Sequence, residues 1–396
     1  MSDIIFEPTN ELRRCFGLMP IRKSWVRTEI KQKTYDPCRT FVYLNGKRIE
    51  RVIQVSDEPG FATYREFSLD RSVSEDGKYL IQSNGKPRRL TVYELERASP
   101  VGMALDFRAP YVYVCNATAN ADYYSSVHEG FELNDLDLFK RWVNAWCEDS
   151  GDRDIREIKR FSKLMPGAHE YREGDFFRFR LDRHTYGYGR IVLDVRNILD
   201  SGKPCWHFFK SEHLYAAVYC VMTDNKHLRP EDLAGKMMLP PRFMVNTRFV
   251  SGEYEIIGNL PITEDVDFPV HYEEFWDTSE YRHTVYQRGR DFRTVEYEDP
   301  VEECFGNRHA RDSVSVTVPM LKRCICDSSI APYWETWNRG ELSTDLRNPE
   351  LADTLDRILK HVGAVYDEKT ARMRLENPAP NRTAKKIKIN YKRNVY

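Results

Sequence analysis

The sequence lacks any long run of apolar residues. No window approaches the ~18 consecutive apolar residues of a membrane-spanning helix. The segment from Met1 to Glu7 has neither the basic start nor the apolar stretch of a signal peptide. We therefore expect a cytoplasmic protein that does not contact a membrane. Its 41% hydrophobic and 13% aromatic residues are enough for packed cores, which excludes a wholly disordered chain.

A disulfide framework is also missing. The nine cysteines are scattered without short, regular spacings, so we expect reduced and mostly buried thiols. Cys324 and Cys326 form the only close pair. On an alternating strand both thiols would face one side, and they would hold a metal ion if two further ligands came from elsewhere. The sequence identifies no such ligands, so we predict neither a metal site nor a cofactor.

Catalytic motifs are absent as well. None of the ten histidines belongs to an H-E-x-x-H motif, and Ser125 and Ser126, although near His128, lie outside any G-x-S-x-G elbow. The stretch Gly187-Tyr188-Gly189 lacks the third glycine of G-x-G-x-x-G and precedes a strand. We interpret these glycines as sites of close backbone approach. We therefore predict no enzymatic activity and leave the question open for residues 1–150.

A β-hairpin over residues 174–195 is the best-defined element that the sequence does contain. Apolar side chains alternate along both of its strands, with a short turn between them. We expect the hairpin to open a small barrel, with one face buried and the other wet. The buried face would hold Phe177, Phe179, Leu181, Ile191, Leu193 and Val195, and the wet face Arg178 and Arg180.

The first part of the chain predicts an antiparallel sheet with a helix packed on it. Three Asn-Gly or Asp-Gly pairs, at 45–46, 76–77 and 84–85, separate alternating runs and indicate tight hairpin turns. Apolar residues then recur at helical spacing, which predicts a helix over 135–147 with Asn134 as its N-cap. The polar stretch 148–152 is the best domain boundary, so we assign residues 1–150 to a β-rich domain of unknown type.

The second part is also strand-rich. Helical spacing predicts a helix from Ile155 to Pro166-Gly167, and Asn348-Pro349 begins a helix over 349–362 that ends at Gly363. Strands are expected at 215–222, 253–258, 285–289 and 314–318. The predicted fold is α+β and strand-dominated. Its parts are an N-terminal sheet with a helix in 1–150, a mostly β, barrel-like domain in 151–325, an extension in 326–375 and a basic flexible tail in 376–396.

Charge is strongly segregated along the chain. The net charge is −1, but six of the 60 basic residues lie in the last sixteen positions, without an acid. Residues 264–303 hold thirteen acids against four arginines, a net −9, interleaved with aromatic side chains. Acids around aromatic anchors are typical of a protein-binding surface, although a solvated sheet face has the same composition. The candidate partner-binding residues are Glu273, Glu274, Trp276, Asp277, Glu296, Glu298, Asp299, Glu302 and Glu303.

The hairpin also resembles a known family. Gly174-Asp175-Phe176-Phe177 followed by Tyr186-Gly187-Tyr188-Gly189-Arg190-Ile191 is similar to the G-D-x-F … Y-x-x-G-R-V opening of the bacterial immunity protein 26 family, found in polymorphic-toxin loci. The order of later features fits, including the apolar strand 215–222 and Pro240-Pro241. The resemblance covers about residues 168–325 and does not extend to residues 1–150.

The resemblance implies a non-catalytic cytosolic immunity protein that binds and neutralises a cognate protein toxin. An acidic, aromatic surface suits a basic nuclease toxin, because it can imitate the phosphate charge of the toxin's substrate. The alternative is a nucleic-acid-associated enzyme or adaptor that uses the N-terminal domain. In that case the tail would bind nucleic acid, with cations on phosphates and Tyr391 stacking on a base.

Overall fold

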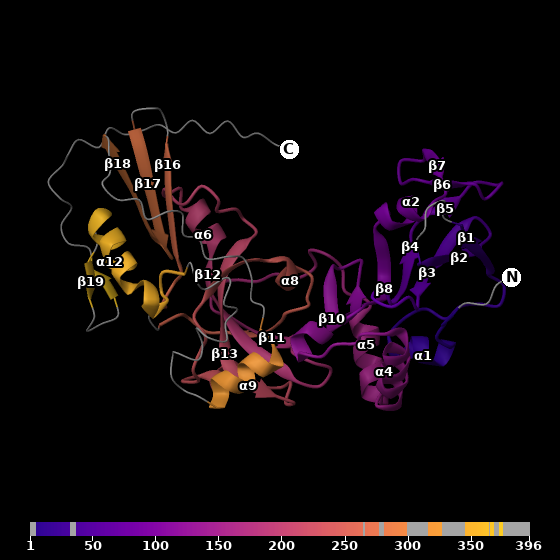
Figure 1. The fold of residues 1–396 in the computed structure, drawn as a ribbon. Coiled ribbons are helices and arrows are strands. Elements are labelled where there is room, and N and C mark those ends of the chain that lie inside the picture. The colour runs from indigo at the N-terminus through magenta and orange to yellow at the C-terminus, as the bar shows by residue number, and fades with distance from the viewer. Residues whose placement is uncertain are drawn as a thin grey trace.

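The computed structural model describes residues 5–31, 37–263, 266–276, 281–298, 316–326, 345–363, 365–367 and 372–374. It shows a strand-dominated α+β protein made of antiparallel sheets, as the sequence predicts. A ten-stranded sheet occupies the N-terminal part, and a five-stranded and a three-stranded sheet follow (Figure 1). Within the described part of the chain, no helix is long and apolar enough to cross a membrane.

The N-terminal sheet is built from hairpins. The strands follow each other in the order β10-β9-β8-β4-β3. Strand β3 also pairs with β2, which pairs with β1, and the short strands β5, β6 and β7 continue the sheet from β3. The three predicted Asn-Gly and Asp-Gly turns join β2 to β3, β5 to β6 and β6 to β7, which confirms them. The strands are β1 Val26–Ile30, β2 Arg39–Asn45, β3 Arg48–Ser56, β4 Thr63–Leu69, β5 Ser72–Val73, β6 Tyr79–Ile81, β7 Pro87–Arg89, β8 Pro100–Arg108, β9 Tyr111–Asn116 and β10 Ala121–Ser125.

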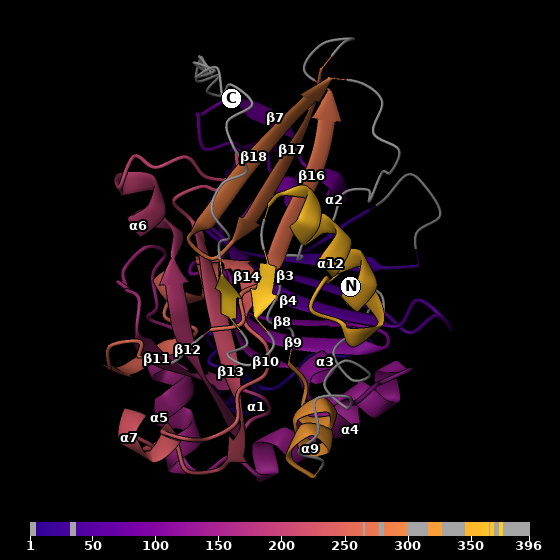
Figure 2. The same ribbon diagram turned by 90° about the vertical axis from the view of Figure 1, so that its left-hand side faces the viewer.

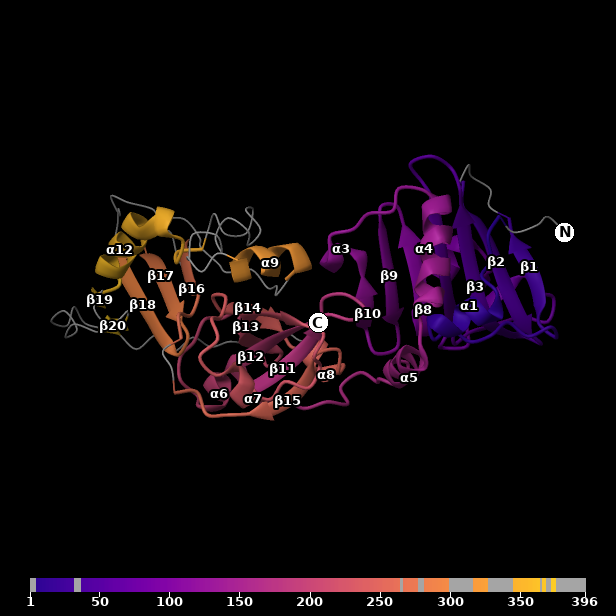
Figure 3. The ribbon, with the colours of Figure 1, turned by 90° about the horizontal axis from the view of Figure 1, so that it is seen from below.

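Helices cover this sheet and complete its core. Helix α4 lies along one face (Figure 3), where Phe139 stacks on Phe107 with ring centroids 4.6 Å apart. Helix α5 packs into the same core through Ile158, and Leu95 of α2 is buried on the opposite face. The helices are α1 Asn10–Cys15, α2 Val92–Arg97, α3 Ser126–Glu129, α4 Leu136–Glu148 and α5 Asp152–Phe161.

Two helix ends differ from their predicted positions. The N-cap of α4 is Asp135, whose carboxylate accepts a hydrogen bond from the Leu138 amide at 2.7 Å, so the prediction of Asn134 was wrong by one residue. Helix α5 ends at Phe161 and does not reach Met165, which is 53% exposed. The backbone turns away there because the Asn116 side chain binds the carbonyl oxygens of Phe161 and Leu164.

The predicted hairpin forms the centre of the second sheet. Strands β11 and β12 pair in the order β14-β13-β12-β11-β15, and β13 contains the predicted buried run 215–222. Strands β14 and β15 form its two edges, so the described sheet is open and not closed into a barrel. Its elements are β11 Asp175–Arg180, β12 Tyr186–Asp194, β13 His213–Thr223, β14 Arg242–Val245, β15 Glu255–Asn259, α6 Val195–Asp200, α7 Pro230–Leu233 and α8 Thr247–Val250.

Glycines in β12 allow two phenylalanine rings to lie across the strand. Phe177 pairs with Gly189, and Phe179 with Gly187. A Cβ atom at Gly189 would lie 2.2 Å from the Phe177 ring, and one at Gly187 would lie 2.4 Å from the Phe179 ring. These glycines therefore allow close packing and do not form a phosphate loop, as predicted.

The hairpin is buried more completely than the sequence suggests. All nine residues of β12 are buried, and other side chains cover Arg178 and Arg180. The prediction that these two arginines lie on a solvent-exposed face was therefore wrong. A β-bulge between Ile191 and Leu193 also places these two side chains in different core clusters, instead of on one face. Arg178 is covered by Glu255 and Lys226, and Arg180 by Tyr123 and Glu157.

The segment after the second sheet includes one helix where a strand is predicted. Helix α9, Val318–Cys326, starts at the end of the expected strand 314–318, of which Val314 and Ser315 lie outside the described residues. Thr317 caps it by accepting from the Met320 amide at 3.3 Å, and Pro319 fits its first turn. The prediction that Cys324 and Cys326 share one strand face was therefore wrong, because Cys324 is buried and Cys326 is exposed.

A three-stranded sheet and a helix complete the described fold. The sheet runs β16-β17-β18 and includes the predicted strand 285–289 up to Arg288; Figure 2 shows it above the five-stranded sheet. The predicted helix 349–362 is confirmed, although its first turn is a 3-10 helix capped by Asn348. The bounds are β16 Val270–Trp276, β17 Tyr281–Arg288, β18 Asp291–Glu298, η1 Pro349–Leu351, α12 Ala352–His361, β19 Val365–Asp367 and β20 Arg372–Arg374. The predicted tail 376–396 lies outside the described residues.

Candidate functional site

The acidic segment forms the β16–β18 sheet, which lies on the side of the molecule away from the N-terminal sheet (Figures 1 and 3). Tyr272 and Tyr286 pack together with Ile358 and Leu359 of α12. On the other side of β16, His271 is fully buried and stacks on Trp206 with ring centroids 4.3 Å apart. Both faces of β16 are therefore occupied where the strand begins.

The described acids of β16 make contacts within the chain. Glu273 accepts a hydrogen bond from the Trp206 indole at 3.1 Å, lies 3.7 Å from His207 Nδ1, and is 13% exposed. Glu274 accepts a hydrogen bond from the Tyr272 hydroxyl at 2.8 Å. Glu273 therefore holds the loop around Trp206 against the three-stranded sheet.

The remaining candidates lie at the far end of this sheet or beyond it. Trp276 pairs with Arg282, Glu296 with His283 and Glu298 with Tyr281, so the backbone places all three candidates near one end. The side chains of Trp276, Glu296 and Glu298 are outside the described part, as are residues Asp277, Asp299, Glu302 and Glu303 altogether.

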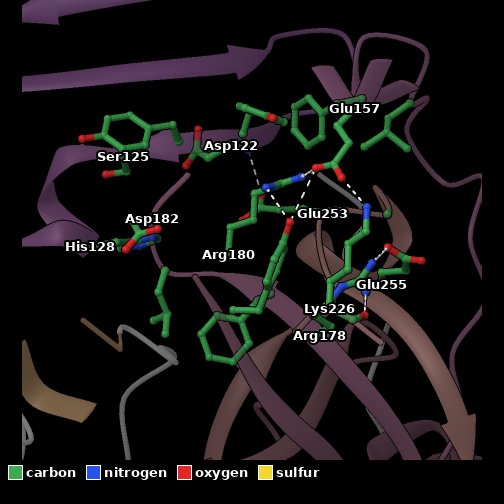
Figure 4. A pocket seen from close by; sticks show the side chains of 18 of the residues that line it. Asp122, Ser125, His128, Glu157, Arg178, Arg180, Asp182, Lys226, Glu253 and Glu255 are labelled. Carbon is green, nitrogen blue, oxygen red and sulfur yellow. Dashed lines mark hydrogen bonds and ion pairs between the residues drawn. The ribbon is translucent and has the colours of Figure 1, made fainter. Parts of the chain in front are cut away.

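A second candidate site lies between the N-terminal sheet and the five-stranded sheet. It is a cavity of about 340 Å³ (Figure 4). One wall comes from β10, α3 and α5, and the other from β11, β12, Lys226 and the segment 252–255. Such a junction between two packed units is a common location for ligand pockets.

Glu157 of α5 connects the two walls at one end of the cavity. It accepts a hydrogen bond from Arg180 Nη2 at 2.8 Å and forms an ion pair with Lys226. Burial alone would raise its pKa, but the hydrogen bonds from Lys226 and Arg180 outweigh burial and lower the pKa to about 2. Arg180 also lies over the Tyr123 ring at 4.5 Å, which explains why this arginine is covered.

A second group of charges lies near the segment 252–255. Glu253 accepts from the Asp122 backbone amide at 2.9 Å and forms an ion pair with Arg248. Burial nevertheless raises the pKa of Glu253 to about 7, and burial also raises the pKa of Asp122. The Asp122 carboxylate is 3.9 Å from Arg248, so two carboxyl groups share one guanidinium.

Ser125 and His128 line the same cavity but do not form a hydrolase triad with an acid. In a Ser-His-acid arrangement the carboxylate contacts the imidazole and raises its pKa. Here burial, together with the nearby Arg248, lowers the pKa of His128 to about 4. Among the described residues, no carboxylate makes a hydrogen bond or ion pair with His128. The described residues also contain no group of three or more His, Cys, Asp or Glu side chains arranged to hold a metal ion.

The sequence did not predict this cavity because its groups come from distant segments. Asp122 lies 131 positions before Glu253, and Glu157 lies 69 positions before Lys226. Among the lining residues, Ser125 and His128 are close enough in the sequence to be compared with a nucleophile and a base. Pairing across such distances leaves no periodic pattern in a single sequence.

The comparison with family models gives one match in the middle of the chain. Residues 172–282 match the family model described as Immunity protein 26, which confirms the resemblance seen at the hairpin. The comparisons with curated proteins and with solved structures gave no match. The matched region runs from the hairpin into β17 and includes the sheet wall of the cavity. This middle region is therefore similar to immunity proteins.

Proposed function

We propose that this protein binds a cognate toxin and neutralises it by covering part of the toxin's surface. The match of residues 172–282 to Immunity protein 26 is the observation that supports this function. The partner is a protein toxin, and its binding requires no cofactor or metal ion.

The proposed toxin-binding surface is the far end of the β16–β18 sheet. This end holds Trp276, Glu296 and Glu298 within a segment of net charge −9. A basic toxin, such as a nuclease, fits that charge, because cations that bind nucleic-acid phosphates also bind carboxylates. Glu273 is a poor contact residue in this proposal, since its carboxylate is already bonded to Trp206.

Coexpression with the protein encoded immediately upstream tests the function. We expect a complex of fixed stoichiometry in which the toxin's activity is lost. Copurification of nucleic acid alone would contradict the proposal and favour the nucleic-acid-associated alternative.

Charge variants test the surface. The double variant Glu296→Gln, Glu298→Gln should weaken toxin binding about tenfold or more and reduce its salt dependence, because each acid contributes steering and charged hydrogen bonds. The control variant Asp57→Asn, Glu75→Gln removes two exposed acids from the N-terminal sheet and should leave the Kd unchanged. Equal Kd values for both variants would show that the toxin does not bind at this end of the β16–β18 sheet.

A further inference from the structure

The cavity beside α3 contains polar side chains with unused hydrogen-bonding capacity. Three of them, Asp122, Ser125 and His128, come from one short segment formed by β10 and α3. Buried polar groups in folded proteins are nearly always hydrogen-bonded, so unused groups facing a cavity need an explanation.

Ser125 is the clearest of these groups. The residue is 4% exposed, and it occupies the N-cap of α3, where a serine hydroxyl normally accepts from a backbone amide. Its side chain makes no such cap bond and no other hydrogen bond within the described part of the chain. Ser125 is among the residues that line the cavity (Figure 4).

Asp122 and His128 have unused hydrogen-bonding capacity beside it. The Asp122 carboxylate has Arg248 as its ion-pair partner, at 3.9 Å, which is too long for a hydrogen bond. The Asp122 side chain is 35% exposed, but the surrounding protein still raises its pKa by burial. A carboxyl group in the wall of a cavity has both properties. His128 is neutral above a pKa of about 4, so one ring nitrogen is free to accept a hydrogen bond.

Among the described residues, Asp122 has no close counter-charge at this end of the cavity. Glu253 and Asp122 share Arg248 as their cation, and Glu253 is the residue that forms the close ion pair. Three other lining cations are already paired, Arg178 with Glu255, and Arg180 and Lys226 with Glu157. The lining residue Arg160 forms no ion pair within the described part of the chain. Apolar surface from Phe161 and Phe179 lies in the same cavity.

We propose that this cavity binds a small organic cation, a primary amine or guanidinium with an apolar body. The cationic head donates hydrogen bonds to Asp122, Ser125 and His128, and the apolar body lies against Phe161 and Phe179. A volume of about 340 Å³ accommodates a ligand of that size. This site is distinct from the proposed toxin surface and does not depend on it.

Calorimetric titration of the full chain with two probes of the same shape tests the proposal. n-Butylguanidinium is charged and n-butylurea is neutral, and we expect the guanidinium to bind about tenfold more tightly or better, as a charged hydrogen bond predicts. Asp122→Asn should abolish that preference. The exposed Asp57→Asn serves as the matched control and should retain it.

Two results would overturn the proposal. One is equal affinity for the charged and neutral probes in the wild-type protein, and the other is a guanidinium affinity that Asp122→Asn leaves unchanged. If Asp122→Asn does not fold, Ser125→Ala replaces it and should weaken guanidinium binding about threefold or more through the lost hydrogen bond. Neither probe involves the toxin. A negative result in the titration therefore does not contradict the toxin-binding proposal, and a negative toxin-binding result does not contradict the proposed cation site.

Discussion

At the scale of single residues, the junction shows one residue type in two opposite states. Glu157 and Glu253 both line the cavity, but the pKa of Glu157 is lowered to about 2 while that of Glu253 is raised to about 7. Glu157 accepts charged hydrogen bonds from both Arg180 and Lys226, which outweigh burial. Glu253 has one guanidinium, from Arg248, and burial dominates.

The raised pKa of Glu253 predicts a pH dependence of stability. The folded protein keeps a proton on Glu253 that the unfolded chain releases above about pH 4.5. The resulting stabilisation is therefore complete below that pH and is lost as pH rises through about 7, by an amount on the order of 3 kcal/mol. Urea unfolding from pH 5 to 8 measures this loss.

Glu253→Gln should flatten that pH profile, because an amide does not titrate. Glu255→Gln is the matched control, since Glu255 lines the same cavity but its side chain is 60% exposed. An unchanged slope in the Glu253 variant would show that another group causes the pH dependence.

At the scale of elements, helix starts depend on which side chain reaches a free amide. Asn134 and Asp135 are both good capping residues, and the sequence pattern does not choose between them. The structure chooses Asp135, because Leu136 must already be helical to enter the core with Phe139 and Val143. The same difficulty applies to Thr317, which caps α9 although the alternating residues around it predict a strand.

Two alanine variants test the cap of α4. Asp135→Ala should lower the free energy of unfolding by about 1 kcal/mol, because it removes the bond to the Leu138 amide. Asn134→Ala should change it by less than about 0.5 kcal/mol, since Asn134 is exposed and does not cap the helix. Thermal or urea denaturation distinguishes the two, and equal losses would contradict the assignment of the cap.

At the scale of the whole molecule, α5 connects the two large sheets. Its apolar side packs into the N-terminal core through Ile158, while Glu157 reaches Arg180 and Lys226 of the region similar to Immunity protein 26. Arg183 adds a second connection, donating a hydrogen bond to the Trp146 carbonyl at 2.6 Å and stacking on that indole. The arginine face of the hairpin is thus used for contact within the chain.

Glu157→Gln should loosen this connection. Removing one partner leaves Arg180 and Lys226 without a counter-charge, which costs about 3 kcal/mol when such a pair is largely buried. The cost should appear above pH 4.5 and disappear as pH falls towards 2, because the wild-type carboxylate is itself protonated there. Hydrogen exchange of the 162–174 segment between the sheets reports the loosening.

Glu75→Gln is the control for this experiment. It removes an ion pair with Lys47 that is largely exposed, so its effect should stay below about 0.5 kcal/mol. Unchanged exchange in the Glu157 variant would mean that the remaining contacts, such as those of Arg183, hold the junction on their own.

The sequence by itself determined the local features of this protein. The Asn-Gly and Asp-Gly turns, the periodic helices at 136–148 and 352–361, and the hairpin with its family resemblance all depend on neighbouring residues. Their physics is short-range, because positive φ angles, helical spacing and strand alternation act within a few positions. A single sequence displays such patterns directly.

Only the tertiary structure decided how the sheets meet. It placed the N-terminal sheet and α5 over Arg180, bonded Glu273 to Trp206, and enclosed the cavity around Asp122 and Glu253. Each of these contacts joins residues far apart in the sequence. Their energy depends on burial and on the distance between charges, which exist only once the chain has folded.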